Sequence, residues 1–277
     1  MVPGDGQNEP PPRVGPVERP LVMGVVNVTP DSFSDGGLYL DHDAAIAHGR
    51  TLVAAGADVV DVGGESTRPG ADPVPVADEI ERVLPVVAAL APIVRVSIDT
   101  RKAEVAAAAV AAGATLVNDV SATLHEVAAA TGAGWVAMHM RGDPRTMQRD
   151  PRYADVVDDV RAFLVERAET AVAAGVEEVW IDPGIGFGKT VDHNLELLAR
   201  LGELVATGFP VVLGTSRKRF LGVLLAGADG VEGPVVPDDR IEGSLATAVW
   251  GYAAGARMVR AHDVAATVAA ARAVASL

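Results

Sequence analysis

The stretch AAGADVVDVGG, residues 54–64, decides the fold, because it joins an alanine-rich segment, a glycine, a short apolar run, an aspartate and two further glycines. A glycine after such a segment is typical of a helix whose last turn closes in the left-handed conformation. A short, continuous apolar run is typical of a strand buried on both faces of a parallel sheet. The stretch therefore predicts a helix, then a strand with a polar residue at its C-terminal end.

The same pattern recurs along the chain, in residues 111–118, 131–139, 173–182, 207–213 and 254–260. Two further apolar runs, 21–28 and 93–99, lack the glycine and bring the predicted strands to eight. Alanine-rich amphipathic segments lie between the strands and predict helices over 43–55, 78–90, 103–112, 155–174 and 194–206.

Eight strands alternating with helices over about 260 residues predict an α/β fold, a single (β/α)8 TIM barrel with long flexible loops 1 and 2 at its C-terminal face. A doubly wound open sheet of the same elements is the alternative. The polar residues favour the barrel, because they fall at the C-terminal end of every strand rather than at one switch point. They are Asn27, Asp61, Asp99, Asn118, His139, Asp182, Ser216 and Arg260.

Composition excludes several classes of protein. The 277 residues carry a formal charge of −14, and no basic run offers the face that nucleic-acid binding needs. The apolar runs end well before the ~20 residues of a membrane span. The chain has no cysteine, which excludes disulfides and thiol catalysis and favours a reducing cytoplasm. Residues 1–18 are predicted to be a flexible proline-rich tail, and 19–277 a single barrel domain.

Two of the loops after predicted strands combine glycine with groups able to contact a ligand. Loop 1, residues 27–37, reads NVTPDSFSDGG and suits a mobile lid, although ordinary turn chemistry also explains much of it. Loop 2, residues 63–70, reads GGESTRPG; its glycines fit a structural turn, whereas Arg68 suits a phosphate or a carboxylate.

Later loops add an acid and several cations. Residues 182–190, DPGIGFGKT, resemble a phosphate-binding loop, but Pro183 stands where the first glycine is required. We expect instead a glycine-lined platform around Phe187, with Asp182 pointing inward.

Residues 216–219, SRKR, follow a buried strand and place cations over the barrel mouth, although such a triplet is usually a solvated turn. Arg260 and His262 share a strand face and predict an anion site, with a core pair as the alternative.

Seven motifs in this order are similar to those of the dihydropteroate synthase family of pterin-binding barrels, from about residue 21 to the C-terminus. They are GVVNVTPDSFSDGG (24–37), GGESTRPG (63–70), SIDT (97–100), NDV (118–120), DPGIGFGK (182–189), SRK (216–218) and RAHD (260–263). The resemblance implies a transferase of folate biosynthesis that condenses 6-hydroxymethyl-7,8-dihydropterin diphosphate with 4-aminobenzoate and uses Mg2+. It also implies a homodimer.

The resemblance implies a role for each matching residue. The residues implied to bind pterin are Asp99, Asn118, Asp182 and Lys218. The residues implied to act in catalysis are Asp35, Asp99 and Lys218. Diphosphate binding falls to Asn27, Arg68, Arg260 and His262, and Asn27 assists Mg2+. Aminobenzoate binding falls to Phe33, Thr67, Pro69, Phe187 and Arg219. Asp61 is expected to be a buried structural carboxylate, and His139 to lie behind the contact residues.

Two rival interpretations share the pterin site. A pterin-binding methyltransferase working with a corrinoid partner would not need Arg68, Lys218 and Arg260 arranged for diphosphate. A duplicate that only binds pterin is expected to have lost the motifs of its lid loops, and here these motifs are intact.

Overall fold

A computed structural model describes residues 19–29, 42–66, 72–143 and 146–276. Eight strands form one parallel sheet in the order β6-β5-β4-β3-β2-β1-β8-β7. They are β1 (Leu21–Asn27), β2 (Val59–Gly63), β3 (Arg95–Asp99), β4 (Leu116–Asp119), β5 (Gly134–Met138), β6 (Val179–Asp182), β7 (Val212–Leu213) and β8 (Met258–Ala261). The predicted tail, residues 1–18, lies outside the described residues.

The ring closes between β6 and β7. Ile181 and Val211 form an isolated parallel bridge, and the Ile181 N–H donates to the Pro210 carbonyl at 3.0 Å. The predicted (β/α)8 barrel is confirmed, and the open-sheet alternative is wrong.

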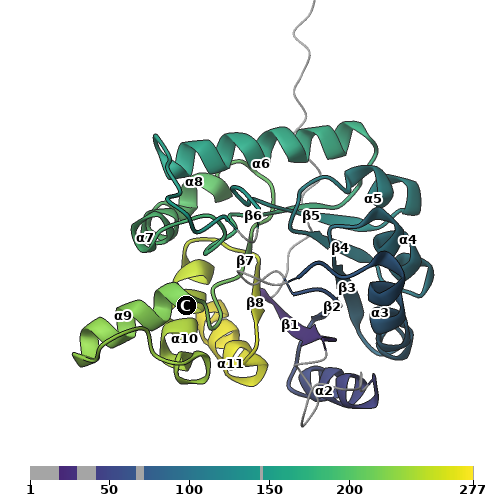
Figure 1. Cartoon of the computed structure of the whole chain (residues 1–277), viewed down its shortest axis with the longest axis horizontal. Coiled ribbons are helices and arrows are strands. Elements are labelled where there is room, and N and C mark those ends of the chain that lie inside the picture. Colours follow the sequence, from purple (N-terminus) through teal and green to yellow (C-terminus); the bar gives the residue numbers. More distant parts are fainter. Residues whose placement is uncertain (1–18, 30–41, 67–71, 144–145, 277) are drawn as a thin grey trace, which may run out of the picture.

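Helices surround the strands (Figure 1). They are α2 (His42–Ala54), α3 (Val76–Leu90), α4 (Ala103–Ala111), α5 (His125–Thr131), α6 (Val156–Ala173), α7 (Val191–Ala199), α8 (Leu201–Val205), α9 (Arg219–Asp229), η1 (Pro237–Asp239), α10 (Ile241–Ala253) and α11 (Val264–Ala275). The helix predicted over 194–206 is wrong in one respect, because Arg200, at φ −106° and ψ 22°, separates it into α7 and α8. Among the described residues no helix is both long enough and apolar enough to cross a membrane.

The glycines of the repeated pattern explain how each helix gives way to its strand. All six have positive φ, from 71° to 115°: Gly56, Gly113, Gly132, Gly175, Gly208 and Gly255. A residue with a Cβ adopts this backbone region only with strain. The glycines therefore end their helices where the sequence predicts.

The barrel interior has an apolar floor, formed by Met23, Val59, Leu116, Val136, Trp180, Val212 and Met258. Side chains two positions further along a strand point to the same face, one layer higher. That next layer is largely polar and includes Asp61, Asn118, Asp182 and Arg260. The floor therefore supports a polar site at the C-terminal ends of the strands.

Candidate active site

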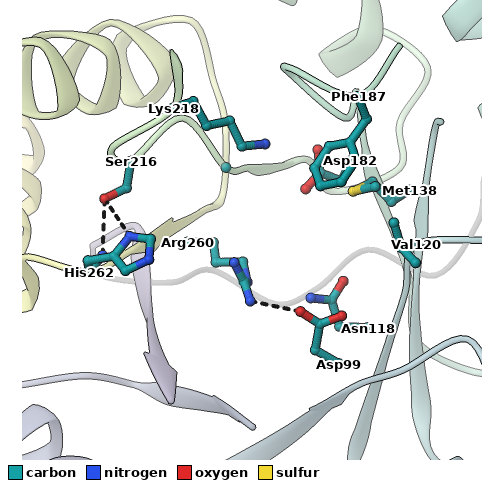
Figure 2. Close-up of a pocket in the computed structure, with 11 residues that line it drawn as sticks. Asp99, Asn118, Val120, Met138, Asp182, Phe187, Ser216, Lys218, Arg260 and His262 are labelled. Carbon is teal, nitrogen blue, oxygen red and sulfur yellow. Dashed lines mark hydrogen bonds and ion pairs between the residues drawn. The ribbon is translucent and has the colours of Figure 1, made fainter. Parts of the chain in front are cut away.

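A pocket opens above the apolar floor, and strands from β3 to β8 and the loops after them supply its walls (Figure 2). Its lining residues are Asp99, Asn118, Val120, Met138, Asp182, Phe187, Gly214, Ser216, Lys218, Arg260 and His262. All four residues predicted to bind pterin are among them. A pocket at this end of the strands is where barrel enzymes build their active sites.

One wall of the pocket is an ion-paired network centred on Arg260. Its Nε donates to Asp61 Oδ2 at 2.6 Å and its Nη2 to Asp99 Oδ2 at 2.9 Å. The amide nitrogen of Asn118 donates to the same Asp61 oxygen at 2.9 Å. Figure 2 shows Asp99, Asn118 and Arg260 gathered on one side of the pocket.

The electrostatics of this wall leave Asp99 easy to protonate. Burial, and then the neighbouring Asp61 carboxylate, raise the pKa of Asp99 to about 7, although Arg260 acts in the opposite direction. Burial alone would lower the pKa of Arg260, but Asp61 and Asp99 more than offset it, so that this pKa is raised. Arg260 therefore stays cationic, whereas Asp99 changes charge near neutral pH.

The opposite wall combines Asp182, Lys218 and Phe187. The Gly184 N–H donates to Asp182 Oδ1 at 2.7 Å, which fixes one carboxylate oxygen. Lys218 donates to the Ile185 carbonyl, and its Nζ lies 4.6 Å from the centre of the Phe187 ring. Burial raises the pKa of Asp182 against the opposing effect of Lys218. Burial also lowers the pKa of Lys218 to about 8, although Asp182 raises it.

The loop after β7, which contains the SRKR motif of residues 216–219, divides its cations between different partners. Lys218 enters the pocket, whereas Arg217, at φ +59°, is turned toward Asp263 and Asp238, at 2.7 Å from each carboxylate. Arg219 is exposed at the first residue of α9 and does not line the pocket. Its contact with aminobenzoate stays a prediction.

His262 lies at the edge of the pocket beside Ser216. The Ser216 hydroxyl is 3.1 Å from His262 Nδ1 and accepts a hydrogen bond from the His262 backbone N–H, also at 3.1 Å. Arg260 and His262 both line the pocket, as their shared strand face predicts.

Other predicted site residues cannot be placed in the pocket. Phe33, Asp35, Thr67, Arg68 and Pro69 lie outside the described residues. Asn27 ends β1 in register with Gly63 and is not among the lining residues. Within the described ranges, no three His, Asp or Glu side chains form a cluster that holds a metal.

Two contributors to the site were not assigned to it from the sequence. Asp61 is fully buried, as expected, but it contacts both Asn118 and Arg260 rather than a remote part of the core. Lys189 is buried near the end of residues 182–190, the loop after β6, which we call the sixth loop. Its Nζ lies 2.9 Å from His139 Nδ1. The period-two alternation from the floor residue Val59 was the available signal for Asp61.

Comparison with known proteins agrees with this site. A family model described as pterin binding enzyme matches residues 23–262. The fold and the pocket thus define the class, a barrel enzyme that binds pterins. The dihydropteroate synthase of Mycobacterium leprae (strain TN) is 51% identical over 256 residues, which cover 89% of each protein. The chain belongs to the dihydropteroate synthase family, transferases of folate biosynthesis.

Solved structures show the same relationship. The Xanthomonas albilineans dihydropteroate synthase with 4-aminobenzoic acid has a TM-score of 0.84 and 47% identity, covering 92% of both chains. The structure of the enzyme from the same organism in complex with 7,8-dihydropteroate has a TM-score of 0.80 and 44% identity, with the same coverage.

Proposed function

We propose that this pocket joins 6-hydroxymethyl-7,8-dihydropterin diphosphate to 4-aminobenzoate, giving 7,8-dihydropteroate and diphosphate. The observation that carries the proposal is that Asp182, Lys218, Asn118 and Asp99 all line one pocket. A pterin ring presents a guanidine-like edge of donors next to a carbonyl. Carboxylate and amide oxygens suit the donors, and an ammonium group suits the carbonyl.

Bond breaking is proposed to come first. The bond between the pterin methylene carbon and the diphosphate oxygen breaks, and its electron pair leaves with the diphosphate. The ionised carboxylate of Asp99 stabilises the cation that remains on the pterin, because it lies in the pocket wall and is shielded from bulk water. Asp35, in loop 1, is proposed to add a second carboxylate to this cation.

The departing diphosphate requires positive charge where its own charge develops. His262 and Arg260 line the pocket. Arg68 and Asn27 are proposed to bind the diphosphate together with them. The single amide oxygen of Asn27 fits Mg2+, which keeps several waters and takes few protein ligands when it binds through phosphate oxygens. When bound, Mg2+ supplies charge neutralisation on the diphosphate.

The amine of 4-aminobenzoate then attacks with its free lone pair. The new carbon–nitrogen bond forms at the methylene carbon, and the nitrogen loses a proton to solvent, so the step needs no general base. Phe187 is proposed to contact the aminobenzoate ring together with Phe33, Thr67 and Pro69. Arg219 is kept only as a candidate for the carboxylate, since its side chain is exposed at the start of α9.

A turnover assay tests the proposal. Purified protein, Mg2+, the pterin diphosphate and 4-aminobenzoate are combined, and dihydropteroate and diphosphate are followed together. Equimolar appearance of both products is expected. Diphosphate without dihydropteroate would mean that the aminobenzoate site has diverged, and the absence of both would favour the pterin-binding rivals. Homodimerisation and a cytoplasmic location remain predictions that gel filtration and cell fractionation can check.

A further inference from the structure

Asp61 joins two residues of the same pocket wall, which lie on different strands, through one oxygen atom. Its Oδ2 accepts from the Asn118 amide nitrogen at 2.9 Å and from Arg260 Nε at 2.6 Å. Asn118 lies on β4 and Arg260 on β8, and β2, which carries Asp61, lies two strands from each in the sheet order. The side chain of Asp61 is fully buried and is not itself part of the pocket lining.

This contact determines how the amide of Asn118 is oriented. A side-chain amide has a donor end and an acceptor end of nearly equal size, so either end can occupy a given place. Asp61 Oδ2 is an acceptor here, because it also takes the hydrogen bond from Arg260 Nε, so Asp61 selects the amide nitrogen of Asn118. The amide oxygen is then the end left to face a ligand.

The same oxygen also sets the position of the Arg260 guanidinium. With Nε held by Asp61, the Nη2 group lies 2.9 Å from Asp99 Oδ2. Asp61 therefore influences Asp99 both through its own charge and through the placement of the cation between them.

We propose that Asp61 is a positioning residue, which orients the Asn118 amide and the Arg260 guanidinium and thereby makes the pocket select ring systems that present an amino donor, rather than a second carbonyl, at the 2-position. The selected class is the 2-amino-4-oxo ring of pterins, and a 2,4-dioxo ring of the same shape is rejected. The inference rests on the proposed function, since it assumes that a pterin occupies this pocket.

Two substitutions separate the geometry of Asp61 from its charge. Asp61→Ala removes the acceptor and frees Asn118 to turn over. Asp61→Asn keeps an oxygen for both donors and places its NH2 group where Oδ1 now lies. In the part of the chain that the structure describes, Asp61 Oδ1 and Ser97 Oγ are both buried without a hydrogen-bond partner. Asp61 and Ser97 are in register on β2 and β3, so the serine hydroxyl is a suitable acceptor for that NH2 group.

Asp58→Ala is the matched control. Asp58 immediately precedes the same strand and also holds an arginine, Arg19, at 2.8 and 2.9 Å, but it does not line or contact the pocket wall. Losing it removes one aspartate–arginine pair without changing the amide of Asn118.

Binding of 6-hydroxymethylpterin and of its 2,4-dioxo analogue, 6-hydroxymethyllumazine, is measured by isothermal titration on folded variants. Asp61→Ala is expected to weaken pterin binding by about tenfold to hundredfold, the effect of losing a hydrogen bond to a charged group. It is also expected to lower the preference for pterin over the dioxo ring by at least about tenfold, because a freed amide can donate. Asp58→Ala is expected to keep the wild-type affinity for pterin and the wild-type preference for pterin over the dioxo ring. Asp61→Asn is expected to keep that preference.

A pH profile gives a second readout that loss of packing alone would not move. The charged groups facing Asp99 are Arg260, Asp61, Glu79, Asp119 and Lys218. Asp61→Asn removes one negative charge from this set. The pKa of Asp99 then falls, and the acidic limb of kcat/KM for the pterin diphosphate moves to lower pH.

Each outcome bears on one claim. If Asp61→Ala keeps the wild-type preference for pterin while folded, or if Asp58→Ala loses it equally, Asp61 is not a positioning residue. An acidic limb that stays in place in Asp61→Asn would also overturn the inference. If the wild-type protein binds neither ring and makes no dihydropteroate, the proposed function fails instead.

Discussion

The chain reserves lysine for three places, residues 102, 189 and 218, and uses arginine for all its other side-chain cations. None of the three lysines is an exposed side chain. Lys102 contacts Glu65 and Glu79 beside loop 2, Lys189 lies behind the sixth loop, and Lys218 enters the pocket. At each of these places the ammonium group, a compact point charge with three donors, contacts carbonyl or carboxylate oxygens.

Asp182→Asn is expected to weaken binding of 6-hydroxymethylpterin by about a hundredfold, because a buried carboxylate loses its charge and one acceptor becomes a donor. Isothermal titration measures the affinity, and circular dichroism reports whether the fold is kept. Asp192→Asn, an exposed aspartate in the first turn of α7, is the control and keeps the wild-type affinity. An unchanged affinity in Asp182→Asn would remove Asp182 from the pterin site.

The pH dependence of kcat/KM is expected to be bell-shaped. Asp99 must be ionised to stabilise the pterin cation, and its pKa of about 7 means that activity falls as the pH drops below this value. Lys218 must be protonated to donate to the ring, and its pKa of about 8 means that activity falls as the pH rises above this value.

Lys218→Arg tests the alkaline side of this profile. Arginine stays protonated throughout the accessible range, so the alkaline limb is expected to disappear up to about pH 10, whatever the loss in absolute rate. Initial rates at subsaturating pterin diphosphate from pH 5.5 to 10 give both profiles. If the alkaline limb persists unchanged in the variant, Lys218 is not its source.

At the scale of elements, the sixth loop is held from behind by Lys189. Its Nζ lies 2.9 Å from His139 Nδ1 and donates to the carbonyls of Gly184 and Phe187 at 2.9 and 3.1 Å. Burial, and then Lys189, lower the pKa of His139 to about 3, so the ring beside the lysine is neutral. The lysine thus ties the end of β5 to the loop that carries Asp182 and Phe187.

Gly184 shows why this loop needs its glycines. It has φ +62°, and an added Cβ would lie 1.8 Å from the His139 carbonyl oxygen. The glycine motif that resembles a phosphate loop therefore serves the close approach of two backbone segments.

Lys189→Met is expected to raise KM for the pterin diphosphate by roughly tenfold and to lower stability by about 1–3 kcal/mol, because buried carbonyls lose their donor. Steady-state kinetics and thermal unfolding measure the two effects. Arg200→Met is the control, since it removes ion pairs to Asp155, Glu196 and Glu203 at the surface and is expected to leave KM unchanged. A wild-type KM in Lys189→Met would show that the loop is held without this lysine.

At the scale of the whole molecule, one closed barrel gathers side chains from distant parts of the sequence. Asp61 and Arg260 are separated by 199 positions, yet they meet at 2.6 Å. The apolar floor occupies the interior below them, so the polar layer lies toward the C-terminal face. Barrel closure therefore determines that there is one site at this face and that it draws on several strands.

The domain boundaries are open to a direct test. A chain that starts at Arg19, without residues 1–18, is expected to keep kcat/KM within about twofold, because the Arg19–Asp58 pair at the start of the barrel is retained. The truncated and full-length proteins are compared in the turnover assay and by thermal unfolding. A loss of activity of tenfold or more would show that the tail contributes to the site.

Local sequence signals were enough to predict the architecture and much of the candidate site. Strand burial, helix-ending glycines and polar residues at strand ends are local signals, and they predicted all eight strands and the residues that line the pocket from β3, β4, β6 and β8. The division between α7 and α8 was not predicted. The amphipathic periodicity continues across Arg200, and only the backbone angles of this residue change.

The pairing of the charges, in contrast, follows from the assembled barrel. Sequence showed Asp61 as a buried acid and Arg260 as a cation for an anion site, but not that they share a hydrogen bond or that Asn118 donates to the same oxygen. The direction of a long side chain such as that of Arg260 depends on the side chains that surround it inside the closed barrel. Electrostatic pairing in a barrel interior joins residues that no sequence period relates, so it appears only when the strands are assembled.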